Sequence, residues 1–554
     1  MSARTLMLLF AAACSASAQV AAPLAGPKDA PEQVKKIFSE YDHTDTPGCT
    51  VGVSLGGVEV LRSAYGMADL EHHIALSPDS VLEAGSISKQ FTAAAVLLLA
   101  EQGKLSLSDP VRKFLPELPD YGTTITIEQL IHHTSGLRDW GSVAEVQGWP
   151  RSTRKYSNAW VLEIAAHQKA LNYKPGDEWS YTNTGYNLLA IIVQRVSGKS
   201  LAEFTHEHIF APLGMQTTSW RDDFQRIVEN RAGAYEISEG REHELMPFEN
   251  AYGNGGLLTT VDDLLRWNER FDASGRSGEA SMGGSSFVQS ELVPGKLNDG
   301  RTLFYAAGLM LADHHGMREV SHSGATAGYR AWLGFYPDQK LSVAVLCNAA
   351  EADSTSLGHQ VADVYLPHTS PRAAGSTEPA LMAGVEGLYE SRRDHTTLSI
   401  ELKDGKLLAQ GKLPLIADSA TSFYLRPESA TYQLTTDAAG KVTGMRVVSM
   451  GYEMDTFDKV ERAHPTESEL QPMTGEYVAD EAETAFQVVL TPKGLEIHQR
   501  PDSVFPLKPT YTGGFASEFG SIRFLRDSSG KVTGISLGDS RLWDLRFRRL
   551  DARP

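Results

Sequence analysis

Ser86 and Lys89 stand three residues apart at the start of an apolar stretch that is typical of a helix. Side chains at this spacing lie on one face of a helix, one turn apart. A lysine beside a serine hydroxyl can activate the hydroxyl as a nucleophile without a histidine. The pattern S-x-x-K is common by chance. Ser86 and Lys89 could equally be exposed residues at the start of a helix, with no catalytic role. The chemistry therefore depends on partners elsewhere in the chain.

Two further polar motifs could complete such a site. Tyr181 and Asn183 form the motif Y-x-N between a Lys-Pro-Gly turn and an apolar helical stretch. His322 begins the motif His-Ser-Gly at a predicted strand, and Gly324 would let a ligand approach the backbone closely. Taken singly, Tyr181 is typical of a buried core tyrosine, and His322 of a surface or core histidine.

The composition limits the classes of function. The chain has 554 residues, too many for one ordinary domain, with 41% hydrophobic and 22% charged residues, as in soluble globular proteins. The net charge is −18, and no cluster of Lys and Arg stands out. Nucleic acid and an anionic membrane surface are therefore not expected as partners.

Residues 1–18 have the features of a signal peptide. Arg4 precedes an apolar stretch, and the small residues at 16–18 offer a cleavage site before Gln19. We expect a periplasmic or secreted protein with no transmembrane segment, because no stretch is long enough to span a bilayer. A lipoprotein anchor at Cys14 is the weaker alternative.

Hydrophobic periodicity predicts strands at both ends of the first two thirds of the chain and helices between them. Strands are expected at 49–55, 58–65, 318–323, 331–336 and 341–347, and helices at 86–102, 127–132, 159–168, 184–196 and 200–210. This order is typical of an α+β domain, an antiparallel sheet of five or more strands flanked by helices and carrying a helical insertion. Residues 271–286, rich in Gly and Ser, are expected to form a long loop.

The last third of the chain is rich in short alternating segments, and it repeats itself. Residues 438–444 (AAGKVTG) match residues 528–534 (SSGKVTG) at an offset of 90. Each unit suits a small, lipocalin-like antiparallel β-barrel. The predicted organisation is a signal peptide (1–18), a catalytic domain (19–370), a linker (371–383) and two barrel domains (384–462 and 463–554). We expect the barrels to serve stability or an interface.

In this order and spacing, the motifs S-x-x-K, Y-x-N and H-x-G resemble those of the serine β-lactamase and penicillin-recognising enzyme superfamily. The resemblance is greatest to its class C-like branch of D-aminopeptidases and esterases. Stretches at 133–137, 212–215, 255–257 and 335–337 also resemble that family, so the similarity covers about residues 31–366. The family implies that the strands at 49–55 and 341–347 are antiparallel neighbours. On that basis we predict a disulfide between Cys49 and Cys347.

The family and the chemistry together suggest a role for each residue. Ser86 would attack a carbonyl carbon and form an acyl-enzyme. Tyr181 is the candidate base, although a free tyrosine has a pKa of about 10. A cation about 4 Å away, at an effective dielectric of about 20, is worth about 4 kcal/mol or about three pKa units, and Lys89 would supply that charge. Lys89 as the direct base is the alternative, and the sequence does not choose between the two.

Four residues are expected to bind the substrate. Asn183 would orient Lys89 or the substrate amide, and the N–H of Ala325 would share an oxyanion hole with the N–H of Ser86. His322 and Gly324 complete the set. Most relatives with β-lactam chemistry carry lysine where His322 stands, and histidine is mostly neutral at pH 7 and a weaker anchor for an anion. This departure favours a D-aminopeptidase or esterase over a β-lactamase.

We therefore expect a serine hydrolase that cleaves amide or ester bonds of a small molecule or peptide, most similar to a D-aminopeptidase. A broad-range carboxylesterase and a β-lactamase are alternatives, as is a binding or sensor protein that is acylated without turnover. No cofactor or metal is expected, because the histidine pairs at 72–73, 132–133 and 314–315 are adjacent, so their side chains diverge. Ser54 fits G-x-S-x-G, but it lies in a predicted strand that leads into another strand. The oligomeric state is not indicated.

Overall fold

The computed structural model describes residues 26–550 except 152, 272–283, 368–381, 383, 420 and 426–429. The predicted signal peptide, Cys14 and the predicted linker apart from Met382 lie outside these residues. No helix in the described ranges combines the length and apolar character needed to cross a membrane.

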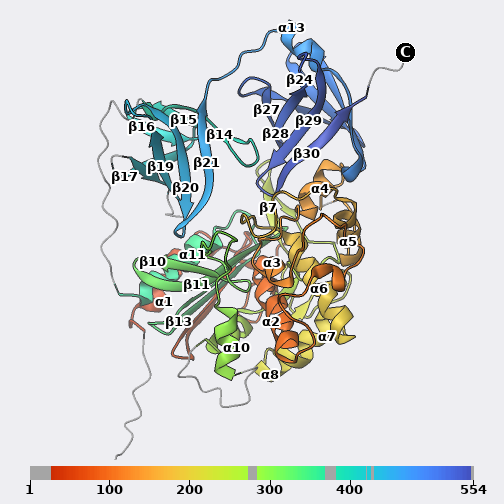
Figure 1. Cartoon of the computed structure of the whole chain (residues 1–554). Coiled ribbons are helices and arrows are strands. Elements are labelled where there is room, and N and C mark those ends of the chain that lie inside the picture. Colours follow the sequence, from red (N-terminus) through yellow and green to blue (C-terminus); the bar gives the residue numbers. More distant parts are fainter. Residues whose placement is uncertain are drawn as a thin grey trace, which may run out of the picture.

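A six-stranded antiparallel sheet forms the centre of the first domain (Figure 1). Its order is β10 (Met310–His314), β11 (Met317–Thr326), β12 (Tyr329–Tyr336), β13 (Leu341–Cys347), β1 (Cys49–Leu55) and β2 (Val58–Tyr65). The first hairpin of the chain therefore joins the last strand of the domain. Cys49 lies opposite Cys347 in the β1–β13 register, and a disulfide joins them. The predicted sheet, the neighbouring strands and the disulfide are confirmed.

Helices cover both faces of this sheet because the strand residues alternate between them. Val343 and Val345 of β13 pack with α1 (Ala30–Ile37) and α11 (Ser354–Tyr365). Ala344 and Leu346 face the opposite core, which contains α2 (Ser88–Glu101) and α9 (Val261–Glu269). Every residue of α2 from Ser88 to Leu99 is buried, as expected for a helix that is apolar on all sides.

The predicted helices of the insertion agree with the structure to within a few residues, and one further helix, α4 (Trp140–Val146), was not predicted. The insertion contains α3 (Ile127–Ile131), α4, α5 (Asn158–His167), α6 (Asn183–Ser197) and α7 (Leu201–Thr205). The predicted helix at 200–210 continues beyond α7 as a π-helical turn, His206–Phe210. Of the predicted loop at 271–286, residues 272–283 lie outside the described residues, and α10 (Gly284–Glu291) begins inside it.

Two small antiparallel barrels follow, as predicted. Strands β14 (Gly387–Ser391) to β21 (Tyr452–Val460) form a closed barrel in chain order. Strands β22 (Gly475–Ala479) to β30 (Leu542–Arg549) form a nine-stranded sheet that nearly closes, with the consecutive strands β25 (Ser503–Pro506) and β26 (Lys508–Pro509) at its edges. We call these barrel 1 and barrel 2. The domain boundaries at 370, 383 and 462 remain predictions.

The sequence repeat produces equivalent hairpin turns in the two barrels. The N–H of Gly440 donates to the carbonyl of Asp437 at 3.0 Å, and the N–H of Gly530 donates to that of Asp527 at 3.0 Å. The side chain of each aspartate also accepts a backbone N–H two residues later. The repeated motif therefore forms a turn in which the aspartate side chain caps the backbone and the glycine adopts a positive φ.

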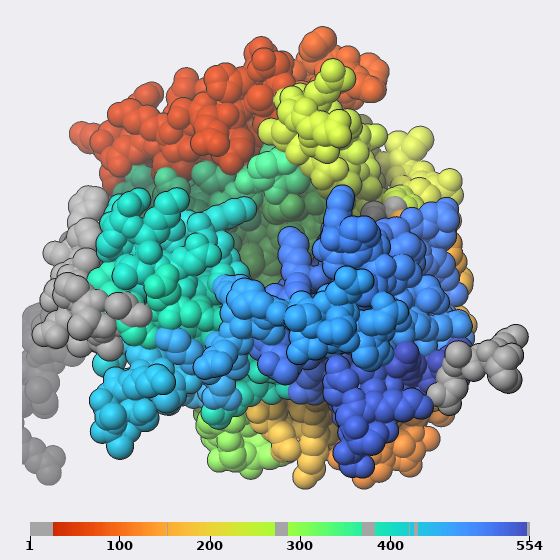
Figure 2. Space-filling view, turned by 90° about the horizontal axis from the view of Figure 1, so that it is seen from above, coloured from red at the N-terminus to blue at the C-terminus, as the bar shows by residue number. Residues whose placement is uncertain are grey.

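Both barrels pack on the first domain, side by side (Figure 2). Barrel 2 shares a core with α4, in which Trp140 and Val143 lie in one cluster with Phe486 and Leu542. Barrel 1 contributes Tyr452, whose ring packs near Trp179 and Phe304 at centroid distances of 6.5 and 6.0 Å. Barrel 2 is therefore fixed against helix α4, and barrel 1 against the loops that carry Trp179 and Phe304.

Candidate active site

Ser86 lies in a 3-10 turn, η1 (Gly85–Ile87), that leads directly into α2. This turn packs on β11 backbone against backbone. A Cβ added to Gly324 would lie 2.1 Å from the carbonyl oxygen of Ala84, and one added to Gly85 would lie 2.5 Å from the nitrogen of Ala325. Since no larger residue allows this approach, the two glycines bring Ser86 next to Ala325.

Lys89 lies one helical turn after Ser86 and is fully buried. Its Nζ atom is 3.1 Å from Oγ of Ser86, 3.0 Å from Oδ1 of Asn183 and 2.6 Å from the carbonyl oxygen of Asn254. Burial, together with the nearby guanidinium of Arg541, holds the pKa of Lys89 well below its usual value. A neutral amine has two N–H donors and one lone pair. If the N–H groups serve the two amide oxygens, the lone pair is left for the Ser86 hydroxyl.

The Tyr181 ring lies beside this amine, with Nζ of Lys89 4.7 Å from the ring centroid. Burial raises the pKa of Tyr181, while a hydrogen bond with Ser86 and the positive charge of Arg541 act in the opposite direction. Burial therefore favours the neutral form of both Tyr181 and Lys89.

A buried carboxylate fixes the turn that carries Tyr181 and Asn183. Asp139 accepts the backbone N–H of Asn183 at 2.6 Å and caps α4 through the N–H of Gly141 at 2.9 Å. His133 packs on the Tyr181 ring at a centroid distance of 4.5 Å, and its Nδ1 accepts the N–H of the intervening threonine at 3.3 Å. Burial holds the pKa of His133 well below its usual range, so this ring is neutral.

His322 is buried in the middle of β11. Its Nδ1 lies 2.6 Å from the carbonyl oxygen of Ser323, which can only accept, so Nδ1 carries the proton. Its Nε2 therefore accepts the hydroxyl of Tyr305 at 3.0 Å. Burial lowers the pKa of His322 to about 3, and the ring carries no charge at pH 7.

A cleft of about 590 Å³ opens in front of Ser86. The structure brings all seven predicted residues together there, with Lys89 behind the cleft wall and the others lining it: Ser86, Tyr181, Asn183, His322, Gly324 and Ala325.

Sequence reasoning missed several residues of this site, including Asn254, Arg151, Arg330 and Arg541. Asn254 directly precedes the Gly255-Gly256 motif, so the family resemblance could have indicated it. Arg151 and Arg541 also line the cleft. Arg541 comes from the turn between β29 (Val532–Asp539) and β30 of barrel 2, far from any catalytic motif in the chain.

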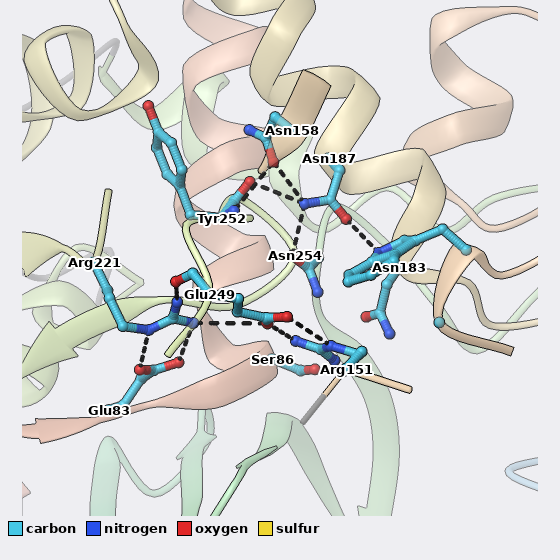
Figure 3. A network of polar contacts seen from close by, with 12 residues as sticks. Glu83, Ser86, Arg151, Asn158, Asn183, Asn187, Arg221, Glu249, Tyr252 and Asn254 are labelled. Carbon is cyan, nitrogen blue, oxygen red and sulfur yellow. Dashed lines mark hydrogen bonds and ion pairs between the residues drawn. The ribbon is translucent and has the colours of Figure 1, made fainter. Parts of the chain in front are cut away.

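A chain of buried charges leads to Arg151 (Figure 3). Glu83 precedes the nucleophile turn and accepts a hydrogen bond from Arg221 at 2.8 Å. Arg221 lies 3.9 Å from Glu249, which in turn accepts Nε of Arg151 at 3.2 Å. Negative and positive groups alternate along this chain, so each buried charge has an opposite neighbour. Figure 3 shows Arg151 at its end, next to Ser86.

A cluster of histidines and carboxylates lies away from the cleft. His314, Glu319 and His359 place one potential ligand atom each within 4.8 Å of one another, and adjacent His315 approaches Asp363, the partner of His314. The expectation that adjacent histidines diverge therefore fails at 314–315, because both reach the same carboxylate. Glu319 already accepts hydrogen bonds from three side chains, those of Ser321, Tyr336 and His359.

The chain is similar to known proteins over most of its length. The family described as Beta-lactamase matches residues 34–366. Penicillin-binding protein 4* of Bacillus subtilis (strain 168) is 28% identical over 423 residues, which cover 70% of this chain and 89% of that protein. The D-aminopeptidase of Cereibacter sphaeroides (strain ATCC 17029 / ATH 2.4.9) is 30% identical over 333 residues, 59% of this chain and 62% of that protein, so the chain spans less than two thirds of its length.

Two further proteins are also similar to the C-terminal part of this chain. The D-aminopeptidase of Brucella ovis is 25% identical over 532 residues, covering 91% of this chain and 96% of that protein. A crystal structure of SurE superposes with a TM-score of 0.55 at 21% identity, covering 78% of this chain and 98% of that one. At this identity the superposition shows a shared fold.

Proposed function

Because the chain belongs to the β-lactamase family, and its relatives support a serine hydrolase of that fold, we propose that it hydrolyses amide or ester bonds through an acyl-enzyme on Ser86. The observation that carries this proposal is the buried amine of Lys89, 3.1 Å from Oγ of Ser86. A nucleophile and a base within hydrogen-bonding distance are what acyl transfer requires.

In this proposal Lys89 takes the proton of Ser86 as Oγ attacks the substrate carbonyl. The N–H groups of Ser86 and Ala325 would receive the resulting oxyanion. Tyr181 gives its hydroxyl proton to the leaving group and takes a proton from the Lys89 ammonium, so that Lys89 is again a neutral base. Water then attacks the acyl carbonyl while Lys89 takes a proton from it, and Ser86 leaves with a proton returned by this pair. Tyr181 as the base is the alternative, but burial raises the pKa of Tyr181 and so disfavours its phenolate.

The substrate that we propose is a small amide or peptide of a D-amino acid. The D-aminopeptidases among the relatives support this class, since one of them aligns over 91% of this chain. The neutral ring of His322 argues against a β-lactam, because it supplies no cation where related enzymes have lysine. We also propose export through the signal peptide at 1–18, which N-terminal sequencing of the protein isolated from its native cells would test.

The test compares hydrolysis rates on an uncharged N-acetyl-D-alanyl anilide, a short-chain nitrophenyl ester and a chromogenic cephalosporin. We expect the anilide to be the best substrate, and Ser86→Ala to abolish turnover of all three. Ser54→Ala is the matched control, since Ser54 lies in strand β1 and should keep full activity. Substantial hydrolysis by Ser86→Ala would refute the assignment of the nucleophile.

A further inference from the structure

The turn between β29 and β30 delivers one arginine of barrel 2 into the cleft of the first domain. Arg541 lies at the tip, with its guanidinium carbon 5.0 Å from the centroid of the Tyr181 ring. Tyr181 is part of the proposed catalytic group, so a positive charge carried by barrel 2 stands beside the reacting atoms.

The tip is held in place from both sides. Within the turn, the carboxylate of Asp539 accepts the N–H groups of Arg541 and Leu542 at 2.6 and 2.8 Å. Across the interface, the carbonyl of Arg541 accepts the N–H of Asp139 at 3.2 Å and the side-chain amide of Asn172 at 3.0 Å. These four hydrogen bonds fix the backbone of the turn at the cleft, from which the Arg541 side chain reaches the Tyr181 ring.

The charge of Arg541 is uncompensated. Within the described part of the chain, no carboxylate oxygen lies within ion-pair distance of its guanidinium. Arg151, on the Ser86 side of the cleft, is in contrast paired with Glu249, and its side chain is still 34% exposed. A protein of net charge −18 thus gathers three guanidinium groups in the cleft of its nucleophile, those of Arg151, Arg330 and Arg541, with the carboxylate of Asp353 also in its lining.

We propose that Arg541, assisted by Arg151, forms a subsite for a substrate carboxylate, so that this enzyme prefers anionic substrates over neutral or cationic ones. A guanidinium presents paired N–H donors that match the two oxygens of a carboxylate. The cation of this subsite comes from the barrel 2 turn beside Tyr181 and not from strand β11, where His322 is neutral. The inference rests on the proposed function and specifies its substrate: a D-aminoacyl compound with a carboxylate near the scissile bond. An aminopeptidase substrate, which carries an ammonium group instead, would be repelled.

Two pairs of substrates locate the carboxylate. N-acetyl-D-alanyl-D-alanine and its C-terminal amide differ only in a charge on the leaving group. N-succinyl- and N-acetyl-D-alanyl-p-nitroanilide differ by a charge on the acyl part. For the native enzyme, we expect KM to be lower for the anionic member of at least one pair. Arg541→Gln should raise the KM of that anionic substrate at least about tenfold, because it removes a charge-assisted hydrogen bond. KM for the neutral member should change less than about twofold, and Arg541→Lys should fall between the two.

The control is Arg546→Gln, which removes a largely exposed arginine from the same strand pair. Binding to Ser86→Ala, measured by calorimetry with the acid and amide forms of N-acetyl-D-alanyl-D-alanine and of N-succinyl-D-alanine, tests recognition without turnover. Failure of Ser86→Ala to abolish hydrolysis would refute the proposed function alone. Equal affinity for acids and amides, or an equal effect of Arg541→Gln on both, would overturn the subsite alone.

Discussion

At the residue scale, the site depends on what burial does to two opposite kinds of titratable group. Burial lowers the pKa of Lys89 and raises the pKa of Tyr181. Both shifts favour uncharged side chains, and a neutral lysine is a base. The sequence could place Ser86, Lys89 and Tyr181 in one site through their motifs. It could not decide which residue is the base, because the shifts depend on solvent exposure and on an arginine of another domain.

Replacing Lys89 by arginine separates the two roles that the sequence left open. Arginine keeps a positive charge but does not deprotonate at any pH that the protein tolerates. If Lys89 is the base, Lys89→Arg should lower the rate of Ser86 acylation by about 10²–10⁴-fold, the usual range for general base catalysis. The rate is measured by stopped-flow with a nitrophenyl ester. If Lys89 only supplies charge to Tyr181, Lys89→Arg should keep much of the rate, and Tyr181→Phe should lose it instead.

The pH dependence of acylation should report the charges around Lys89. The base must be deprotonated, so the rate is retained above its pKa and lost as the pH falls through that value. Arg541 and Arg151 lower the pKa of Lys89, whereas Asp139 raises it. Arg541→Gln should therefore move the acidic limb of the kcat profile to higher pH, by up to about one unit. A shift to lower pH, or none, would contradict this electrostatic coupling.

At the element scale, the regular strands and helices were predictable and their close approaches were not. The alternating strands at 49–55 and 341–347 and the apolar helix after Ser86 have periods that identify them, and the structure places β1, β13 and α2 there. The contact of η1 with β11 involves residues more than 200 positions apart, and local periodicity carries no information about it. The sequence indicated this approach only through Gly324 and through the family resemblance, which placed the N–H groups of Ser86 and Ala325 in one oxyanion hole.

Gly324→Ala should therefore displace the nucleophile turn. The added Cβ would meet the carbonyl of Ala84 at 2.1 Å and the nitrogen of Ser86 at 3.0 Å, both of them backbone atoms. We expect destabilisation of about 1–3 kcal/mol, as for other overpacked positions, and at least about a hundredfold loss of kcat through the misplaced oxyanion donors. The measurements are urea unfolding and steady-state kinetics. Gly384→Ala is the control, because its Cβ would meet nothing closer than 3.8 Å; near-native kinetics of Gly324→Ala would contradict the argument.

At the scale of the whole molecule, the barrels and the first domain form one structure around the cleft. Barrel 1 packs Tyr452 against Phe304 and against Trp179, which lines the cleft. Barrel 2 shares a core with α4 and α5 and contributes Arg541. The sequence predicted two repeated barrels and assigned them to stability or an interface. The two repeated units differ at the tip of the turn between β29 and β30. Arg541 of barrel 2 corresponds to Gly451 of barrel 1, 90 residues earlier in the sequence. Among the described residues of the two barrels, only Arg541 lines the cleft.

Arg138 joins barrel 2 to the first domain, and its loss should weaken the subsite from a distance. Its buried guanidinium lies 2.8 Å from a carboxylate oxygen of Glu481 and donates to the carbonyls of Trp543 and Asp544 at 3.4 and 3.2 Å, next to the Arg541 turn. Arg138→Met would leave Glu481 without this cation, although the N–H of Lys169 still donates to its carboxylate, and breaking a buried ion pair costs about 3–5 kcal/mol. We expect this loss in urea unfolding, with partial recovery when Glu481→Gln removes the unpaired charge.

The functional consequence should be selective. With the turn loosened, Arg138→Met should raise KM for the carboxylate substrate as Arg541→Gln does, while a small fluorophosphonate should still label Ser86 at nearly the native rate. Arg548→Met is the matched control, since its ion pair with Asp480 is exposed on both sides and such pairs are worth about 0–1 kcal/mol. If Arg138→Met is destabilised yet discriminates acid from amide as the native protein does, the interface does not position Arg541. Equal loss of fluorophosphonate labelling would instead mean that barrel 2 supports the nucleophile itself.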